Sequence, residues 1–265
     1  MNVRITRTTA GRILRQLRSD HRTVALMIVV PCVLLGLPSW IYADLPGDIF
    51  NRIGPALLGV FPFVVMFIVT SIATLRERTT GTLERLLTTP LGKGDLMLGY
   101  ALAFGAMAVL QALVATGFAV WVCGLDIAGP IGLLVVVALF TALLGTALGL
   151  LASGFARTEF QAVQFMPALV LPQFLLCGLL VPRDLLPPGL EAISNVLPLS
   201  YAVDAMKDVT VLADPLGEVL PSLGVIALWI AASLALIRPH PGRDTSPREC
   251  ATAQPDGVPD CRPGP

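Results

Sequence analysis

Six long stretches without a charged residue divide the chain into apolar blocks. They cover residues 23–43, 53–75, 96–125, 127–156, 160–182 and 219–237, and each is 19 to 30 residues long. An α-helix rises about 1.5 Å per residue and needs about 20 apolar residues to cross a bilayer core of about 30 Å. Buried helices of a water-soluble core are usually shorter than this. The pattern therefore predicts six transmembrane helices, at about residues 23–43, 54–75, 96–123, 130–153, 161–181 and 219–237.

The composition supports a membrane protein, and the balance of its charges bears on possible partners. Of 265 residues, 55% are hydrophobic and 14% are charged, whereas charged residues make up about a quarter of a typical soluble chain. Residues 23–237 are thus expected to form one all-α integral membrane domain. The chain has 18 basic and 18 acidic residues. This balance provides no overall positive field for nucleic acid, so no nucleic-acid partner is expected.

The positions of the basic residues predict the orientation of the helices. If the N-terminus is cytoplasmic, 15 of the 18 basic residues fall in cytoplasmic segments, and only Arg52, Arg183 and Lys207 fall outside. Lysine and arginine are enriched on the cytoplasmic side of membrane proteins. With six crossings, both termini are predicted to be cytoplasmic.

The two ends of the chain differ in character. Residues 1–22 carry six arginines among Ile5, Ile13, Leu14 and Leu17, which is typical of a basic amphipathic helix lying along the inner headgroups. The alternative is a positively charged flank without fixed structure. Residues 238–265 contain seven prolines and three glycines, so a disordered cytoplasmic tail is expected there.

An outer segment between the fifth and sixth predicted spans has a pattern of its own. Leu190, Ile193 and Val196–Leu197 recur at helical spacing opposite Glu191 and polar neighbours. This spacing predicts an amphipathic helix on the outer leaflet. Pro198 is expected to end it.

The cytoplasmic loop between the second and third spans predicts a short helix. Gly81 suits an N-cap, Glu84 lies near the positive end of the helix dipole, and Pro90 stops the helix. Leu83, Leu86 and Leu87 share one side of it. Two turns are too few for stability in water alone, so the apolar side is expected to dock on another surface.

Three sequence strings resemble one family of membrane proteins. The string from Arg78 to Pro90 (RTTGTLERLLTTP) is similar to the coupling-helix motif of ABC-2 type transporter permeases. The region 178–205, with its outer motif of Pro198, Tyr201 and Asp204, resembles the outer region of the same family, and residues 158–165 give a weaker match. The resemblance covers about residues 10–237.

The resemblance implies a dimer of six-span subunits with two separate ABC ATPase subunits. The second permease subunit is expected to be either an identical chain or a paralogue. In that picture a set of residues on the coupling helix contacts the ATPase: Glu77, Gly81, Thr82, Leu83, Glu84, Leu86, Leu87 and Pro90. The alternative is a helix on the membrane surface with no partner.

The resemblance also implies that ATP is hydrolysed by a different polypeptide. The sequence contains no Gly-x-x-x-x-Gly-Lys-Ser/Thr loop, the usual cradle for nucleotide phosphates. ATP and magnesium are therefore expected on the partner subunit. For this chain we expect no catalytic residue, no bound cofactor and no metal, and we expect it not to be an enzyme.

The predicted spans contain no Asp, Glu, Lys, Arg or His well inside the membrane, which disfavours an ion-coupled carrier or a channel and an intramembrane enzyme. Among uncharged polar residues, Gln164, Gln173, Thr70 and Ser71 are candidates for a translocation path, with interhelical hydrogen bonding as the alternative. The resemblance favours the two glutamines. Pro167 and Pro172 are candidates for a helix hinge, and Gly145, Gly149 and Ser153 predict a close-packing stripe.

The function expected from the resemblance is that of a permease subunit of an ATP-driven exporter in a prokaryotic plasma membrane. Short outer loops favour an amphipathic or lipid-like cargo of the drug or antibiotic type, entering from the surrounding lipids. The alternatives are export of a polysaccharide or lipid-linked glycan, and a non-transporting membrane assembly or immunity protein.

Overall fold

A computed structural model describes residues 3–79, 93–156 and 158–236. The regular elements in these ranges are all helical. They are α1 (Val3–Ser19), α2 (His21–Ile41), α3 (Ile49–Thr79), α5 (Lys93–Trp121), α6 (Ile131–Phe155), α7 (Glu159–Leu176), the 3-10 turn η1 (Arg183–Leu185), α8 (Pro188–Ser194), α9 (Pro198–Val211) and α10 (Leu216–Leu236). The predicted tail, 238–265, and most of the predicted coupling helix lie outside the described residues.

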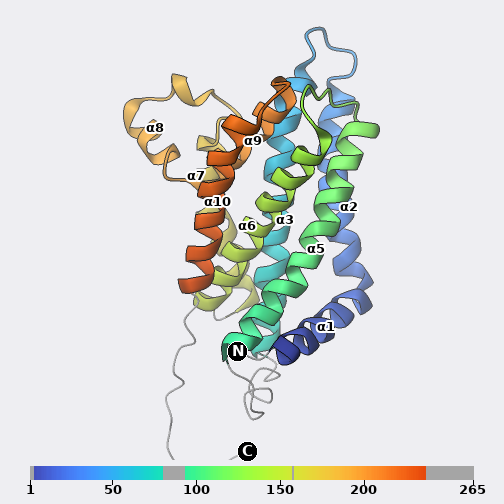
Figure 1. Cartoon of the computed structure of the whole chain (residues 1–265), viewed down its shortest axis with the longest axis vertical. Helices are drawn as coiled ribbons and strands as arrows, with labels where there is room; N and C mark the ends of the chain where they lie inside the picture. The colour runs from blue at the N-terminus through green and yellow to red at the C-terminus, as the bar shows by residue number, and fades with distance from the viewer. Residues whose placement is uncertain (1–2, 80–92, 157, 237–265) are drawn as a thin grey trace, which may run out of the picture.

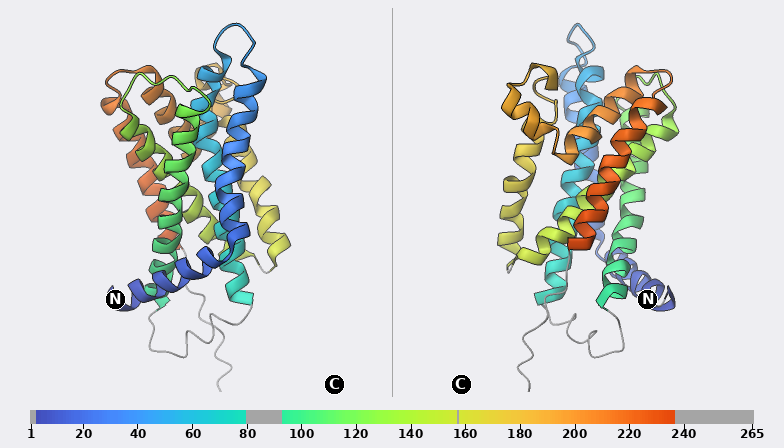
Figure 2. Two further views of the ribbon diagram at one scale, coloured as in Figure 1. Left: turned by 90° about the vertical axis from the view of Figure 1, so that its right-hand side faces the viewer. Right: turned by 60° about the vertical axis from the view of Figure 1, so that its left-hand side comes forward.

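The long helices form an up-and-down bundle. In Figure 1, α2, α3, α5, α6, α7 and α10 run roughly along the long axis, and successive helices point in opposite directions. The two further views in Figure 2 show α8 and α9 capping the upper end and α1 inclined across the lower end. Consequently α1, the end of α3, the start of α5 and the end of α10 all lie at the lower end.

Five of these helices are long and apolar enough to cross a membrane: α2, α3, α5, α6 and α10. The sixth predicted crossing corresponds to α7, whose apolar part, Val163–Leu176, is shorter. This helix ends at Leu176, before the predicted limit of the span, because the chain turns at Gly178 with φ +83°. The sixth crossing and the cytoplasmic side of the bundle therefore stay predictions.

The basic N-terminal segment forms helix α1, and its place along the inner headgroups stays a prediction. One side of α1 packs on the bundle, where Ile13 is buried with Met27 of α2 and Tyr100 of α5. Asp20 separates α1 from α2 and caps the second helix, since its Oδ1 atom accepts a hydrogen bond from the Thr23 backbone amide at 3.3 Å. A carboxylate at this position also interacts favourably with the helix dipole.

The centre of the bundle is the contact between α3 and α6. A β-carbon added at Gly145 would lie 2.3 Å from the carbonyl oxygen of Phe63, and one at Gly149 would lie 2.6 Å from that of Phe67. Only glycine permits so close an approach of two helix backbones. The predicted small-residue stripe is thus an intramolecular packing surface.

Large apolar side chains cover much of the outside of the bundle. Leu26 on α2, Leu113 on α5 and Leu228 on α10 are all more than half exposed. Trp40 and Trp121 project from the upper ends of α2 and α5, with 80% and 81% of their surface exposed. Tryptophan is enriched where helices leave the apolar core of a bilayer, so these side chains fit a membrane boundary at the upper end of the bundle.

The outer segment differs from the single helix expected there. The amphipathic helix is present as α8, but it has only seven residues, and Leu190 and Ile193 are exposed on it. A second helix, α9, follows. Pro198 begins this helix at its first turn, where proline loses no hydrogen bond. Leu199, Val203 and Met206 of α9 are fully buried against the bundle.

Candidate functional site

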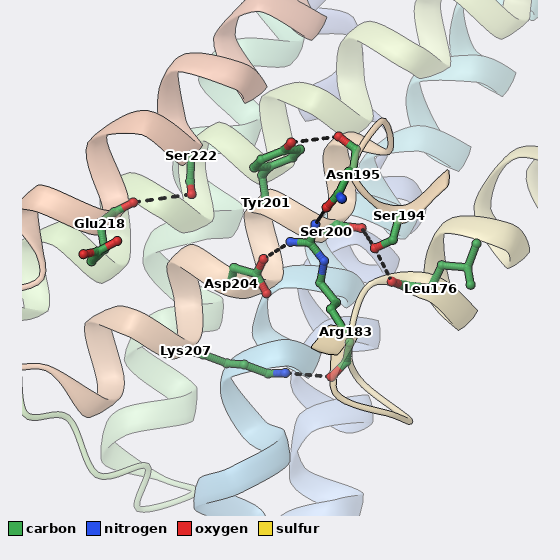
Figure 3. Close-up of polar contacts among 11 residues, drawn as sticks. Leu176, Arg183, Ser194, Asn195, Ser200, Tyr201, Asp204, Lys207, Glu218 and Ser222 are labelled. Atoms are coloured by element: carbon green, nitrogen blue, oxygen red, sulfur yellow. Dashed lines mark hydrogen bonds and ion pairs between the residues drawn. The ribbon is translucent and has the colours of Figure 1, made fainter. Parts of the chain in front are cut away.

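A cluster of polar side chains joins η1, α8 and α9 at the upper end of the bundle; we call it the outer cluster, and it consists of Arg183, Asn195, Tyr201, Asp204 and Lys207. Figure 3 shows Arg183 at its centre. The Arg183 guanidinium pairs with the Asp204 carboxylate and donates a second hydrogen bond to the side-chain oxygen of Asn195. It also lies 5.6 Å from the centre of the Tyr201 ring, within the range of a cation–π interaction.

Further hydrogen bonds tie the outer cluster to the backbone around it. The Tyr201 hydroxyl donates to the Asn195 carbonyl at 2.7 Å. The Lys207 ammonium donates to the carbonyl of Gly178 at 2.6 Å. Gly178 follows the last turn of α7 and has a positive φ, so the lysine fixes the point at which the chain leaves this helix.

Two serines make a second bridge between α7 and α9. The Ser194 hydroxyl donates to the carbonyl of Leu176 at 2.8 Å and lies 3.1 Å from the hydroxyl of Ser200. Both serines are fully buried. The end of α7, the end of α8 and the start of α9 are therefore held in one arrangement.

Burial and charge oppose each other at Asp204. Burial raises the pKa of its carboxyl above the usual range, while the charges of Arg183 and Lys207 act to lower that pKa. The pKa of Asp208, one turn further along α9, is also raised, first by burial and then by the negative charges of Asp204 and Glu218. The positive charges of Arg183 and Lys207 thus stabilise the partly buried carboxylate of Asp204.

Two residues of this cluster belong to the outer motif that the family resemblance implies. Pro198, Tyr201 and Asp204 were expected as an outer motif, and Tyr201 and Asp204 lie one turn apart on α9, both in contact with Arg183. Arg183 and Lys207 were not among the residues expected at this motif. The signal that points to them is their departure from the positive-inside pattern, because they are two of only three basic residues on the predicted outer side.

The four candidates for a translocation path do not share one surface. Thr70 and Ser71 are fully buried in α3, and their hydroxyls have no hydrogen-bond partner among the described residues. Gln173 is buried and donates to the carbonyl of Leu169 at 3.0 Å, whereas Gln164 is exposed. Nine residues separate the two glutamines, which places them on opposite sides of α7. One face of α7 therefore cannot present both glutamines to the same path.

The candidate hinge lies inside a helix that is largely exposed. Pro167 and Pro172 are exposed on α7, and each removes one backbone donor from the helix. Leu171 and Leu175 beside them are about half exposed, while Val170 packs into the core. The helix α7 therefore lacks backbone hydrogen bonds in a part where few neighbouring side chains restrain it. A hinge at this place stays a prediction.

The predicted ATPase contact lies almost wholly outside the described residues, which leave out Gly81, Thr82, Leu83, Glu84, Leu86, Leu87 and Pro90. Glu77 falls in the last turn of α3. The described residues that flank the segment 80–92 are the end of α3 and the start of α5, and both lie at the lower end of the bundle, where α1 also lies (Figure 2).

The described side chains contain no group of three or more His, Cys, Asp and Glu residues arranged to hold a metal ion. The chemistry of the outer cluster is that of ion pairing and hydrogen bonding between elements. Its arrangement is suited to holding the outer ends of α7 and α9 together.

Comparison with known proteins identifies the family of this chain. The model of the ABC-2 type transporter family matches residues 5–210. The chain is 28% identical over 155 residues to the probable multidrug ABC transporter permease YbhR of Escherichia coli, a match that covers 58% of this chain and 42% of the relative.

Two further relatives are similar. The linearmycin resistance permease protein LnrN of Bacillus subtilis is 24% identical over 174 residues, covering 65% of this chain and 45% of the relative. ABC transporter G family member 20 of Dictyostelium discoideum is 25% identical over 169 residues, covering 64% and 23%. The chain thus matches less than half the length of each of these relatives. Since the family model covers most of its residues, including α1 to α9, the chain belongs to the ABC-2 type transporter family.

Proposed function

We propose that this chain is the membrane permease subunit of an ATP-driven exporter that moves an amphipathic or lipid-like compound out of a prokaryotic cell. The observation that carries the proposal is the family match over residues 5–210. The names of two relatives, a multidrug permease and a linearmycin resistance permease, favour a drug-like or antibiotic-like cargo.

ATP hydrolysis is assigned to a separate subunit, present in two copies, which binds ATP and magnesium. The segment 80–92 is the proposed contact with this ATPase, with Leu83, Leu86 and Leu87 as its apolar anchor and Glu84 on the polar rim. The described helices on either side support this role, because the end of α3 and the start of α5 lie at the end of the bundle that also carries basic α1. A second permease subunit, identical or paralogous, completes the proposed transporter.

The outer cluster belongs to the outward-facing end of the proposed transporter. Movement of the segment 80–92 reaches this end through α3, which spans the bundle and packs against α9. The ion pair between Arg183 and Asp204 holds η1 on α9, and the hydrogen bond from Lys207 to Gly178 holds the chain beyond α7 on the same helix.

The decisive experiment is co-purification of the full chain from its native membranes. We expect an ATP-hydrolysing subunit to co-purify, and we expect the double variant Glu84→Ala with Leu86→Ala to lose it or to lose stimulation of its activity. The matched control is Glu191→Ala with Leu190→Ala on exposed α8, which removes the same two residue types at the opposite end. If no ATPase co-purifies, or if both double variants behave alike, the assignment of the segment 80–92 is wrong.

The cargo is tested separately. Deletion of the chain should increase sensitivity to amphipathic drugs or antibiotics and leave surface glycans unchanged. Loss of a surface glycan with unchanged drug sensitivity would replace the proposed cargo by a polysaccharide or lipid-linked glycan.

A further inference from the structure

A cavity of about 260 Å³ opens at the lower end of the bundle between α1, α2, α3 and α5. We call it the lower cavity. Its volume is close to the lower limit of small-molecule sites, about 300 Å³. The lining residues come from four helices: Ile13 and Gln16; Asp20, Thr23 and Leu26; Ile68, Val69, Ile72, Ala73 and Arg76; and Tyr100 and Phe104. None of them belongs to the outer cluster or to the proposed contact with an ATPase.

The lining is polar at one end and apolar at the other. Asp20, Arg76 and Tyr100 lie where α2 begins, where the apolar part of α3 ends and where that of α5 begins. Ile68 is eight residues before Arg76, which places it about 12 Å deeper along α3. Leu26 at the rim has 61% of its surface exposed, so the cavity opens sideways to the surrounding lipid. This graded lining matches an amphiphile whose chain points into the membrane.

Two opposite charges border the polar end. Thr23 donates hydrogen bonds to Asp20 from its amide and, at 2.6 Å, from its hydroxyl. These bonds and, more weakly, the Arg76 guanidinium keep the pKa of Asp20 below its usual range. The carboxylate is therefore ionised at neutral pH, and its two oxygens retain lone pairs for further donors. A headgroup with only negative charge would meet an ionised acid here.

Tyr100 provides an independent indication of a ligand. The residue lines the lower cavity and only 1% of its surface is exposed, yet its hydroxyl has no hydrogen-bond partner among the described residues. A buried hydroxyl without a partner costs about 1–3 kcal/mol. An ester or phosphate oxygen of a lipid would satisfy it. The rings of Tyr100 and Phe104, with centres 6.4 Å apart, supply an apolar wall for the chain below.

We propose that the lower cavity binds one phospholipid of the adjacent leaflet whose headgroup carries both a phosphate and a primary ammonium, as in phosphatidylethanolamine. Arg76 contacts the phosphate, Asp20 accepts hydrogen bonds from the ammonium, and part of one acyl chain lies against Ile68, Ile72 and Phe104. A choline headgroup has no N–H to donate to Asp20, and a glycerol headgroup brings no positive charge. This lipid is a resident of the subunit, and the site is independent of the transported compound.

The test uses the full chain purified in detergent and titrated with phosphatidylethanolamine, phosphatidylcholine or phosphatidylglycerol of identical acyl chains. Native mass spectrometry counts bound lipids, and thermal unfolding reports their effect. We expect one tightly bound phosphatidylethanolamine per chain, with an affinity about tenfold above that for the other two lipids. Equal binding of the three lipids, or a preference for phosphatidylglycerol, would overturn the proposal.

Variants locate the site. Asp20→Asn keeps a residue that caps helices well and removes the charge, so the preference for phosphatidylethanolamine over phosphatidylcholine should disappear while the fold is retained. Arg76→Gln should weaken both zwitterionic lipids about tenfold, whereas Arg15→Gln on the exposed side of α1 should not. An unchanged lipid preference in Asp20→Asn contradicts the assigned headgroup.

A second pair of variants tests the cavity itself. Ala73→Leu places three further carbons in the lower cavity and should abolish the tightly bound lipid. Ala106→Leu adds the same atoms on an exposed position of α5 and should leave binding unchanged. If Ala73→Leu fails to fold, Tyr100→Phe serves in its place, with an expected affinity loss of about threefold to tenfold. Retention of the lipid by Ala73→Leu would place it elsewhere. These measurements require no ATPase, so their outcome does not depend on the proposed transport function.

Discussion

Arg183 connects three parts of the outer segment through one side chain. It begins η1, pairs with Asp204 on α9, bonds to Asn195 beyond the end of α8, and lies over the Tyr201 ring. The planar guanidinium serves these partners at once because its N–H groups point in fixed, divergent directions. A lysine at the same place would offer a point charge without that geometry.

Replacement of Arg183 by glutamine should destabilise the outer segment. It removes the partner of a half-buried carboxylate, and charge-assisted hydrogen bonds are worth about 1.5–3 kcal/mol each, less where solvent screens them. We expect a loss of about 1–2 kcal/mol, measured as a lower Tm in detergent. Arg183→Lys should recover only part of it. The control is Arg52→Gln, at an exposed arginine near the same end; an equal change in both variants would contradict this role.

The pH dependence of stability should report on Asp204. Because burial raises the pKa of its carboxyl in the folded state, folding favours the protonated form. The contribution of this group is therefore fully present below the ordinary pKa of 3.8 and declines as the pH rises through the folded-state value. We expect Asp204→Asn to reduce this decline in Tm as the pH rises above 3.8.

Arg183→Gln provides the complementary measurement. Removal of the arginine charge takes away a cause that lowers the pKa of Asp204, so the decline in Tm should extend to higher pH in this variant. The pKa of Asp208 is also raised, so this residue too lowers the Tm as the pH rises. The quantity to compare is therefore the difference in Tm between each variant and the parent protein at each pH. A curve for Asp204→Asn parallel to that of the parent would contradict the pKa shift.

At the scale of elements, the length of the uncharged runs predicted the long helices well. The shorter helices of the outer segment were predicted less well. Five predicted spans correspond to long apolar helices, because a run of about 20 uncharged residues has few other stable arrangements. The helix α9 was not predicted, because Pro198 was expected to end the outer helix, whereas in the structure it begins a second one. Its apolar residues Leu199, Val203 and Met206 nevertheless recur at helical spacing.

The outer cluster shows why contacts between residues distant in the sequence could not be predicted. Arg183 and Asp204 are 21 residues apart, and their contact depends on the turn at Gly178 and on the angle between η1 and α9. Neither the turn nor the angle has a periodic signal in the sequence. Which faces of α7 are buried likewise depends on neighbouring helices, so Gln164 and Gln173 were grouped although they point in opposite directions.

The contact between α3 and α6 gives a prediction for one element pair. Gly149→Ala places a β-carbon 2.6 Å from the backbone oxygen of Phe67, so the helices must separate, at a cost of about 1–3 kcal/mol. Gly154→Ala, at an open position on the same helix, should be neutral or slightly stabilising, because alanine favours helices over glycine by about 1 kcal/mol. Thermal unfolding of both variants in detergent checks this; equal Tm values would refute the close contact.

At the scale of the whole molecule, the topology is open to a direct test. Cysteines introduced at Asp44 and Asp214, in a background without native cysteines, should react from outside the cell with a maleimide reagent that does not cross membranes. A cysteine at exposed Gly11 on α1 should react only after the membrane is permeabilised. The reverse pattern would invert the predicted orientation, and labelling of all three from one side would exclude the arrangement in Figure 1.

The close contact between α3 and α6 also has a mechanical consequence. The backbones of α3 and α6 touch at Gly145 and Gly149, with no side chains between them at these points. We therefore expect this pair of helices to resist bending. The neighbouring α7, interrupted by two prolines and widely exposed, bends more readily under the same load. If the lower end of α3 moves, we therefore expect the α3–α6 pair to shift as one unit and α7 to bend.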